Sequence, residues 1–248
     1  PRTVRKPSPQ QKSKFVINKM RAKFIQSEAV AERIYTYWFD SLKPFSYIAG
    51  QYTEVYLPHN KPDSRGEKRW FTLSSSPTEK YFSITTKIPT GTKSSFKQAL
   101  ENLKAGDIIN FSEPMGDFIL PINTKIPIVF IAGGVGITPV RSIIKNLLDT
   151  NQTRNISIFY TVSKSNEFIY KDLLTSFTAK TYFYATNKSI DINDILNKTD
   201  QVQESLYFIS GPEKMVEDVK TELLKSGIDS QKIVADSYKG FNPNKLFG

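Results

Sequence analysis

The hydrophobic pattern changes character near residue 122, and this change constrains the fold more than any other feature. Before it, short segments rich in β-branched and aromatic residues alternate with Gly, Pro, Ser and Asp turns. After it, apolar runs such as "IPIVFIAGG" (126–134) lead into helical patterns such as "TPVRSIIKNLLD" (138–149). The first pattern is typical of an antiparallel barrel or sandwich, and the second of parallel βαβ units.

We therefore predict two domains and a tail. A basic tail or linker, disordered for lack of apolar residues, covers 1–14; a six-stranded antiparallel Greek-key β-barrel covers 15–122; an α/β doubly wound parallel-sheet domain covers 123–248. Expected barrel elements are strands at 14–25, 32–40, 50–58, 68–75, 81–87 and 107–112, and a helix at 94–103. Later elements are strands at 126–134, 155–163, 181–186, 205–210 and 232–238, and helices at 138–149, 166–177, 191–197 and 212–227.

The lack of cysteine and the single histidine, His59, exclude several kinds of chemistry. Disulfides, thiolate zinc sites, cysteine nucleophiles and cysteine-ligated iron–sulfur clusters are impossible, and no metal site is expected. His59 is predicted to be a turn residue, and Trp38 and Trp70 to pack in the barrel. No apolar run reaches the roughly 18 residues of a membrane span. We expect a cytoplasmic location, at the cytoplasmic face of a membrane if an anchoring segment precedes Pro1.

The formal net charge of +10 allows several partners. The first fourteen residues are basic and contain no acidic residue, whereas Lys and Asp or Glu are mixed elsewhere. A solubilising surface is the simplest explanation; a docking face for an acidic partner or an anionic membrane is the alternative. Nucleic-acid binding needs aromatics interleaved with a basic stripe, and the sequence lacks this pattern, so no nucleic acid is expected.

The segment "IAGGVGITPVRS" (131–142) predicts an anion site. It fits neither the G-x-G-x-x-G pattern, whose third glycine is replaced by Pro139, nor the P-loop pattern. Thr138 is the expected N-cap and Pro139 the expected first helical residue. A strand, a glycine turn and a helix N-terminus with free amides favour a bound phosphate.

Two further motifs lie in the predicted barrel. In "RWFTLSSSP" (69–77), Arg69 offers a planar fork for a diphosphate, Phe71 a face for a flat ring and Thr72 a hydroxyl donor. In "GTKSSFKQAL" (91–100), a glycine turn precedes two serines at a helix start, which is a second candidate anion site.

The order of these motifs, with "PMGDF" and "SGPEKM" between and after them, resembles the ferredoxin–NADP reductase-like flavoproteins over about residues 15–241. The resemblance is strongest to bacterial NAD(P)H–flavin reductase modules attached to membrane electron-transfer domains. It implies an FAD-binding FR-type barrel, an NAD(P)-binding domain and hydride transfer from NADH or NADPH to FAD. It also implies an electron acceptor: an iron–sulfur protein, another flavin or a quinone-linked membrane module.

The resemblance also implies residue roles. Arg69 would hold the FAD diphosphate, Phe71 would stack on the isoalloxazine, and Thr72 would donate to flavin N5. Thr72, Ser210 and Asp236 are the implied catalytic residues. The remaining implied cofactor-binding residues are Trp70, Ser75, Thr86, Lys87, Gly91, Lys93, Ser94, Ser95, Gly133, Gly134, Gly136, Thr138, Pro139, Ser163, Lys164, Gly211, Pro212, Met215, Tyr238 and Phe241.

Departures from the family pattern leave alternatives open. Phe71 replaces the usual tyrosine and Ser210 the usual cysteine, so a non-catalytic flavin- or nucleotide-binding module is the second hypothesis. Lys164 stands near where NADP-using relatives often have arginine, which leaves NAD against NADP undecided. Tyr238 or Phe241 either covers the flavin until nicotinamide displaces it or packs in the core.

Overall fold

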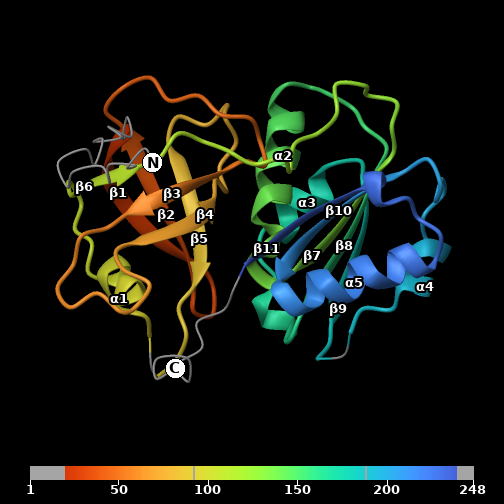
Figure 1. The fold of residues 1–248 in the computed structure, drawn as a ribbon. Coiled ribbons are helices and arrows are strands. Elements are labelled where there is room, and N and C mark those ends of the chain that lie inside the picture. Colours follow the sequence, from red (N-terminus) through yellow and green to blue (C-terminus); the bar gives the residue numbers. More distant parts are fainter. Residues whose placement is uncertain (1–19, 92, 188, 239–248) are drawn as a thin grey trace, which may run out of the picture.

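Two sheets of different construction stand next to each other (Figure 1). The computed structural model describes residues 20–91, 93–187 and 189–238. The predicted basic tail at 1–14 and Phe241 lie outside the described residues. None of the helices in the described part of the chain has the length and apolar composition that a bilayer crossing requires.

The first sheet has six strands in the order β4-β3-β6-β1-β2-β5, and all of its pairings are antiparallel. The pair Leu73–Ile84 bridges the two edge strands, so the sheet curls toward closure. Three rings, Phe39, Phe82 and Phe111, meet at its centre with centroids 5.0–5.5 Å apart. The elements are β1 (Met20–Ala31), β2 (Ile34–Ser41), β3 (Tyr52–Tyr56), β4 (Lys68–Thr72), β5 (Phe82–Lys87), α1 (Ser95–Glu101) and β6 (Ile108–Phe111).

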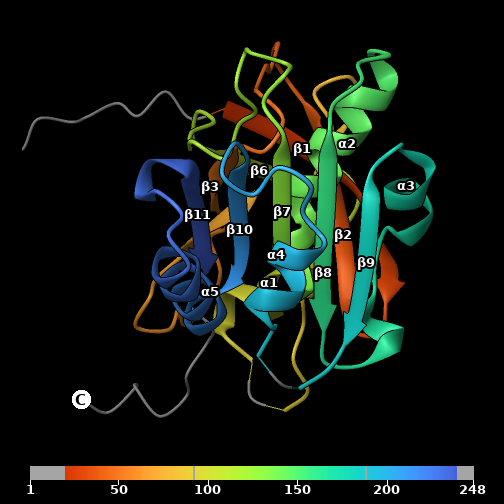
Figure 2. The ribbon, with the colours of Figure 1, turned by 90° about the vertical axis from the view of Figure 1, so that its right-hand side faces the viewer.

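The second sheet is parallel throughout, in the order β11-β10-β7-β8-β9, as Figure 2 shows. Its strands are β7 (Ile128–Gly133), β8 (Ile156–Val162), β9 (Lys180–Ala185), β10 (Leu206–Pro212) and β11 (Ile233–Tyr238). The helices are α2 (Thr138–Asp149), α3 (Lys171–Ser176), α4 (Ile192–Asn197) and α5 (Glu213–Lys225), with short 3₁₀ turns η1 (Gly134–Ile137), η2 (Ser165–Glu167) and η3 (Ser230–Lys232). Every residue of β7 is buried, because α2 and α3 pack on one face of the sheet and α4 and α5 on the other.

One apolar cluster joins the two sheets. Phe118, from the "PMGDF" segment, packs edge-on against Phe208 of β10 at 5.0 Å and beside Phe130 of β7 at 6.2 Å. Ile34 and Ala49 from the first half belong to the same buried cluster. The α/β sheet therefore shares its core with the barrel.

The predicted architecture of an antiparallel barrel followed by a doubly wound parallel sheet is confirmed. The expected helix at 166–177 is wrong in extent: Tyr170 has φ +60°, which separates η2 from α3. The first strand runs to Ala31 rather than to residue 25, because two register shifts let β1 continue along β2.

Substitution of Phe118 tests the shared core. Phe118 is 3% exposed, so Phe118→Ala is expected to lower the free energy of unfolding by about 3–5 kcal/mol. The measurement is urea denaturation followed by fluorescence and circular dichroism. Ile122→Ala is the control: that side chain is fully exposed, and its loss is expected to cost less than about 0.5 kcal/mol. A cost below about 1 kcal/mol for Phe118→Ala would contradict the assignment.

Candidate functional site

A cleft of about 1180 Å³ opens between the two halves of the molecule. One wall is built from β4, β5 and α1; the other is built from the β7–α2 turn, the ends of β8 and β10, and α5. The carboxyl ends of parallel strands are the usual ligand-binding edge of such a sheet. The cleft is larger than most small-molecule pockets, so it has room for extended ligands.

The turn after β7 forms the centre of the second wall. Gly134 has φ +54°, which glycine adopts at little cost. A Cβ on Gly136 would lie 2.2 Å from the Ser210 carbonyl oxygen, so only glycine lets the turn approach β10 this closely. Gly133, Gly134, Gly136 and Thr138 all line the cleft.

The helix start differs from the prediction by one residue. Ile137 is the N-cap of α2, and Thr138 is already helical. The Thr138 hydroxyl donates to the Val135 carbonyl at 2.9 Å instead of accepting an amide proton. The predicted N-cap role of Thr138 is therefore wrong, because the glycines form a 3₁₀ turn that runs directly into the helix. Pro139 follows in the first turn and does not line the cleft.

Tyr238, at the end of β11, lies on this turn. Its hydroxyl donates to the Gly133 carbonyl at 3.1 Å and accepts from the Gly136 amide. Tyr238 lines the cleft, and its ring is partly exposed. Asp236 pairs in register with Ser210 on β10 but does not line the cleft, and burial raises the pKa of its carboxyl.

Strand β4 supplies the opposite wall, where Arg69, Phe71 and Thr72 line the cleft. The Arg69 guanidinium donates to an Asp63 carboxylate oxygen at 2.8 Å and lies 5.2 Å from the Phe96 ring. Phe71 packs on the same ring with centroids 5.8 Å apart. Among the described residues the Thr72 hydroxyl has no hydrogen-bond partner, which leaves it available to a ligand.

The two tryptophans lie in different environments. Trp70 is 55% exposed, and its ring meets Tyr52 edge-on at 5.4 Å while lining the cleft. Its predicted packing in the barrel is wrong, because it lies on the outer side of an edge strand. Trp38 donates its indole N–H to Glu28 at 3.2 Å.

Four basic residues that line the cleft were missed by the sequence motifs: Arg65, Lys97, Lys214 and Lys225. Lys97, on α1, donates to the Lys87 carbonyl, and burial, with Arg65 and Lys87 nearby, lowers the pKa of Lys97 to about 8. Lys97, Arg65, Arg69 and Lys87 all line the cleft. The signal in the sequence is the position of Lys97, on the first turn of a helix that begins at a predicted anion site.

The remaining predicted residues divide between the cleft and its surroundings. Those that line the cleft are Thr86, Lys87, Ser94, Ser163, Ser210, Pro212 and Met215. Those that do not line it are Ser75, Gly91, Lys93, Ser95, Lys164 and Gly211. Lys87 pairs with Glu167 at 2.5 Å, across the two halves, and Lys93 pairs with Glu101 at 2.7 Å.

His59 is more than a turn residue. Its Nε2 lies 2.8 Å from the Ser95 hydroxyl, and its Nδ1 lies 2.7 Å from the Leu57 carbonyl oxygen. The Ser95 hydroxyl also accepts the Asp63 amide at 2.8 Å. These contacts connect α1 to the loop that holds the Arg69 partner, Asp63.

The chain resembles known proteins over most of its length. Residues 130–221 match the family model described as an oxidoreductase NAD-binding domain. A flavohemoprotein of Bacillus cereus is 25% identical over 228 residues, which is 82% of this chain and 55% of that protein. The chain thus spans about half the length of the curated relatives it matches.

Solved structures share the fold. The ferredoxin–NADP⁺ reductase of Plasmodium falciparum superposes with a TM-score of 0.76 at 21% identity, over 89% of this chain and 97% of that one. The flavohem-like FAD/NAD-binding domain of a Vibrio cholerae nitric oxide dioxygenase gives a TM-score of 0.75 at 17% identity, over 89% and 99%. Each superposition extends over 89% of this chain and therefore includes residues of both sheets.

The raised pKa of Asp236 predicts a pH dependence of stability. Because the folded pKa lies above the unfolded one, folding favours the protonated carboxyl, and stability falls as pH rises through the folded pKa. Asp236→Asn removes this penalty and is expected to be more stable than the wild type at pH 7 but not at pH 3, by urea denaturation. The exposed Asp117→Asn is the control. A less stable Asp236→Asn protein at pH 7 would contradict burial as the cause.

Proposed function

We propose that the chain is a ferredoxin–NADP reductase-like flavoprotein that acts as an FAD-dependent NAD(P)H oxidoreductase; the matched NAD-binding domain model and the shared fold support this. One observation carries the proposal: the glycine turn after β7 and the Arg69–Thr72 segment of β4 line the same cleft. Two ligands bound on these two walls would meet between them. FAD supplies the chemistry when bound, since it accepts hydride and releases single electrons.

The barrel wall fits FAD by the chemistry of its side chains. Arg65, Arg69 and Lys97 provide cations for a diphosphate, and arginine matches phosphate with a bidentate fork. Phe71 provides an apolar face for a flat ring, supported from behind by Phe96. The Thr72 hydroxyl would donate to a ring nitrogen of the flavin.

The opposite wall fits a nicotinamide dinucleotide. Backbone amides of the β7–α2 turn and the N-terminus of α2 favour an anionic group, and Gly136 keeps the turn close to β10. Ser210 lies at the end of β10 and would line the nicotinamide pocket, as the resemblance implies. The protein's contribution is to hold the two rings in a reactive arrangement and to exclude water.

The electron acceptor is proposed as a one-electron redox partner or module. The flavohemoglobin of Malassezia yamatoensis, another structural neighbour, contains FAD and heme, and this chain covers 60% of it. An iron–sulfur protein, a second flavin or a quinone-linked membrane module are further candidates; a cysteine-ligated cluster would belong to a partner, because this chain has no cysteine. The net charge of +10 favours a partner with an acidic surface.

Anaerobic stopped-flow reduction tests the proposal. The protein reconstituted with FAD is expected to lose its oxidised-flavin absorbance on mixing with NADH or NADPH, and the ratio of the two rates decides the preferred nucleotide. Tight FAD binding with no reduction by either nucleotide would instead support the non-catalytic alternative.

Lys97 provides a test of the FAD site that does not depend on turnover. Since a charged hydrogen bond contributes about 1.5–3 kcal/mol, Lys97→Met is expected to weaken FAD binding by about tenfold or more at pH 7. With a pKa of about 8, Lys97 loses its charge as pH rises, so wild-type affinity should fall through pH 8 and the variant's should not. Isothermal titration of the apoprotein at several pH values measures both.

The control for this titration is Lys104→Met, an exposed lysine beyond the end of α1. It is expected to bind FAD as the wild type does at every pH. Equal affinities for the wild type and Lys97→Met at pH 7 would remove Lys97 from the site.

A further inference from the structure

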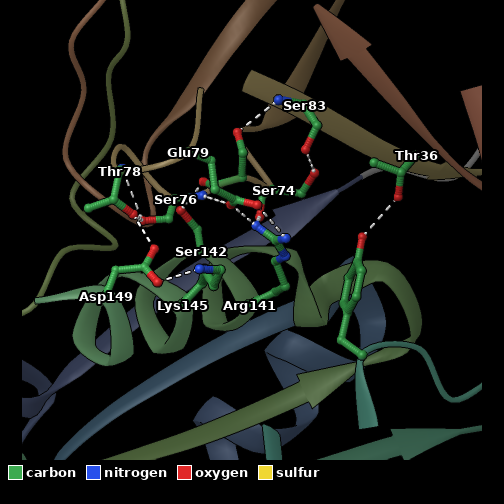
Figure 3. Close-up of polar contacts among 12 residues, drawn as sticks. Thr36, Ser74, Ser76, Thr78, Glu79, Ser83, Arg141, Ser142, Lys145 and Asp149 are labelled. Carbon is green, nitrogen blue, oxygen red and sulfur yellow. Dashed lines mark hydrogen bonds and ion pairs between the residues drawn. The ribbon is translucent and has the colours of Figure 1, made fainter. Parts of the chain in front are cut away.

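Helix α2, which begins at the β7–α2 glycine turn, is hydrogen-bonded to the segment that follows β4. Residues of α2 contact Ser74 and Glu79 in the β4–β5 connection (Figure 3). They also contact Ser75 of the same connection. We call Arg141, Ser142 and these three residues the latch. We infer that the latch sets the spacing between the two walls of the cleft, and that Arg141 is a positioning residue for hydride transfer. The inference rests on the proposed function for its kinetic part only.

The latch has a rigid geometry. The two terminal nitrogens of Arg141 donate to the two carboxylate oxygens of Glu79, with Nη2–Oε1 at 2.9 Å, and Nη1 also donates to the Ser74 carbonyl at 3.1 Å. The side chains of Arg141 and Glu79 are 12% and 18% exposed. The Ser76 amide donates to the same carboxylate at 2.6 Å. A forked arginine–carboxylate pair fixes both distance and orientation.

A second contact continues the latch toward β4. The buried Ser142 hydroxyl donates to the Ser75 carbonyl. The Ser75 hydroxyl in turn accepts the Ser83 amide at 2.8 Å, which ties the connection to β5. The latch residues of α2 therefore bind a segment that is itself hydrogen-bonded to the barrel.

Both ends of the latch are close to the proposed cofactor contacts. Ser74 is the second residue after Thr72, and Arg141 is the third after Thr138. Three residues of helix span about 4.5 Å, and a helix transmits a displacement along its axis. A change at Arg141 would therefore move the β7–α2 turn relative to Thr72.

Other contacts keep the halves together without the latch. Tyr170 lies with its hydroxyl 2.7 Å from the Thr85 hydroxyl and 3.1 Å from that of Thr36, and Phe118 joins the shared core. Removing one partner of a buried ion pair leaves the other charge unpaired and is destabilising, whereas removing both can be near neutral; either change takes away the geometric constraint. Because the other contacts between the halves remain, we expect latch variants to fold, with less exact placement of the two walls.

The chain offers a direct measure of this placement. Because it has no cysteine, spin labels can be attached at Lys23→Cys on β1 and Lys220→Cys on α5, which are both exposed. Pulsed electron–electron double resonance then measures the distance between the two labels, one in each half of the molecule. The doubly labelled protein with an unchanged latch, here called the parent, should give one narrow distance distribution when loaded with FAD. Arg141→Met, Glu79→Gln and the variant that combines these two changes should each give a broader or shifted one.

Kinetics provide the second readout. Arg141→Met is expected to lower the limiting rate of flavin reduction by about ten- to a hundredfold, because small misplacements are costly, while the KM for the dinucleotide changes less than about threefold. Arg141→Lys, which keeps the charge but not the fork, should lie between Arg141→Met and the wild type. The double variant should be no slower than the slower single one, since both remove the same contact.

Lys145→Met is the matched control. Lys145 lies one turn further along α2, and its ammonium pairs with Asp149 of the same helix, which also accepts from Thr78. Lys145→Met therefore removes a cation from α2 without replacing a latch residue. It should keep the parental distances and rates. Unchanged distances in Arg141→Met, or equal effects of Lys145→Met, would overturn the inference. A parent that binds FAD but is not reduced would contradict the proposed function instead, and the distances would still decide whether the latch exists.

Discussion

The burial of Phe118 between the two sheets is the contact on which the cleft depends. A parallel sheet needs cover on both faces, and α2 and α3 cover the face nearer the barrel. Phe118, Ile34 and Ala49 extend that cover from the first half of the chain. The two walls of the cleft are consequently parts of one packed body, and polar contacts such as Arg141–Glu79 refine a distance that apolar packing has already restricted.

The two walls use different chemistry toward anions. The barrel wall presents side-chain cations, since Arg65, Arg69 and Lys97 line the cleft. The opposite wall presents backbone amides around Gly134 and Gly136, where close approach requires glycine. Side-chain cations attract an anion over some distance, whereas amides recognise it only in contact. A cofactor that stays bound suits the first kind of site, and a substrate that must leave suits the second.

The sequence predicted most of the fold because its periodicities are local. Alternation along 81–87 and the run at 126–134 correspond to β5 and β7 within two residues at each end. The helix at 166–177 failed because Tyr170 takes φ +60° while its hydroxyl lies beside Thr36 and Thr85, a contact between distant segments.

For the site, motifs located the walls but not every residue on them. The N-cap at Thr138 was wrong because its hydroxyl serves the Val135 carbonyl. Lys97 was missed because its chemistry comes from burial and from neighbouring cations, neither of which a local pattern contains. For Trp70, the sequence did not indicate which face of its strand is exposed to solvent.

The position of Tyr238 has a consequence for ligand exchange. Its hydroxyl already uses the Gly133 carbonyl and the Gly136 amide, the polar groups that the turn would offer to a newcomer. A dinucleotide that uses this amide trades places with the phenol, so its observed affinity is a difference between two sets of hydrogen bonds. Under the proposed function the protein would thus carry its own competitor, which would weaken retention of the oxidised nucleotide and favour its release after each turnover.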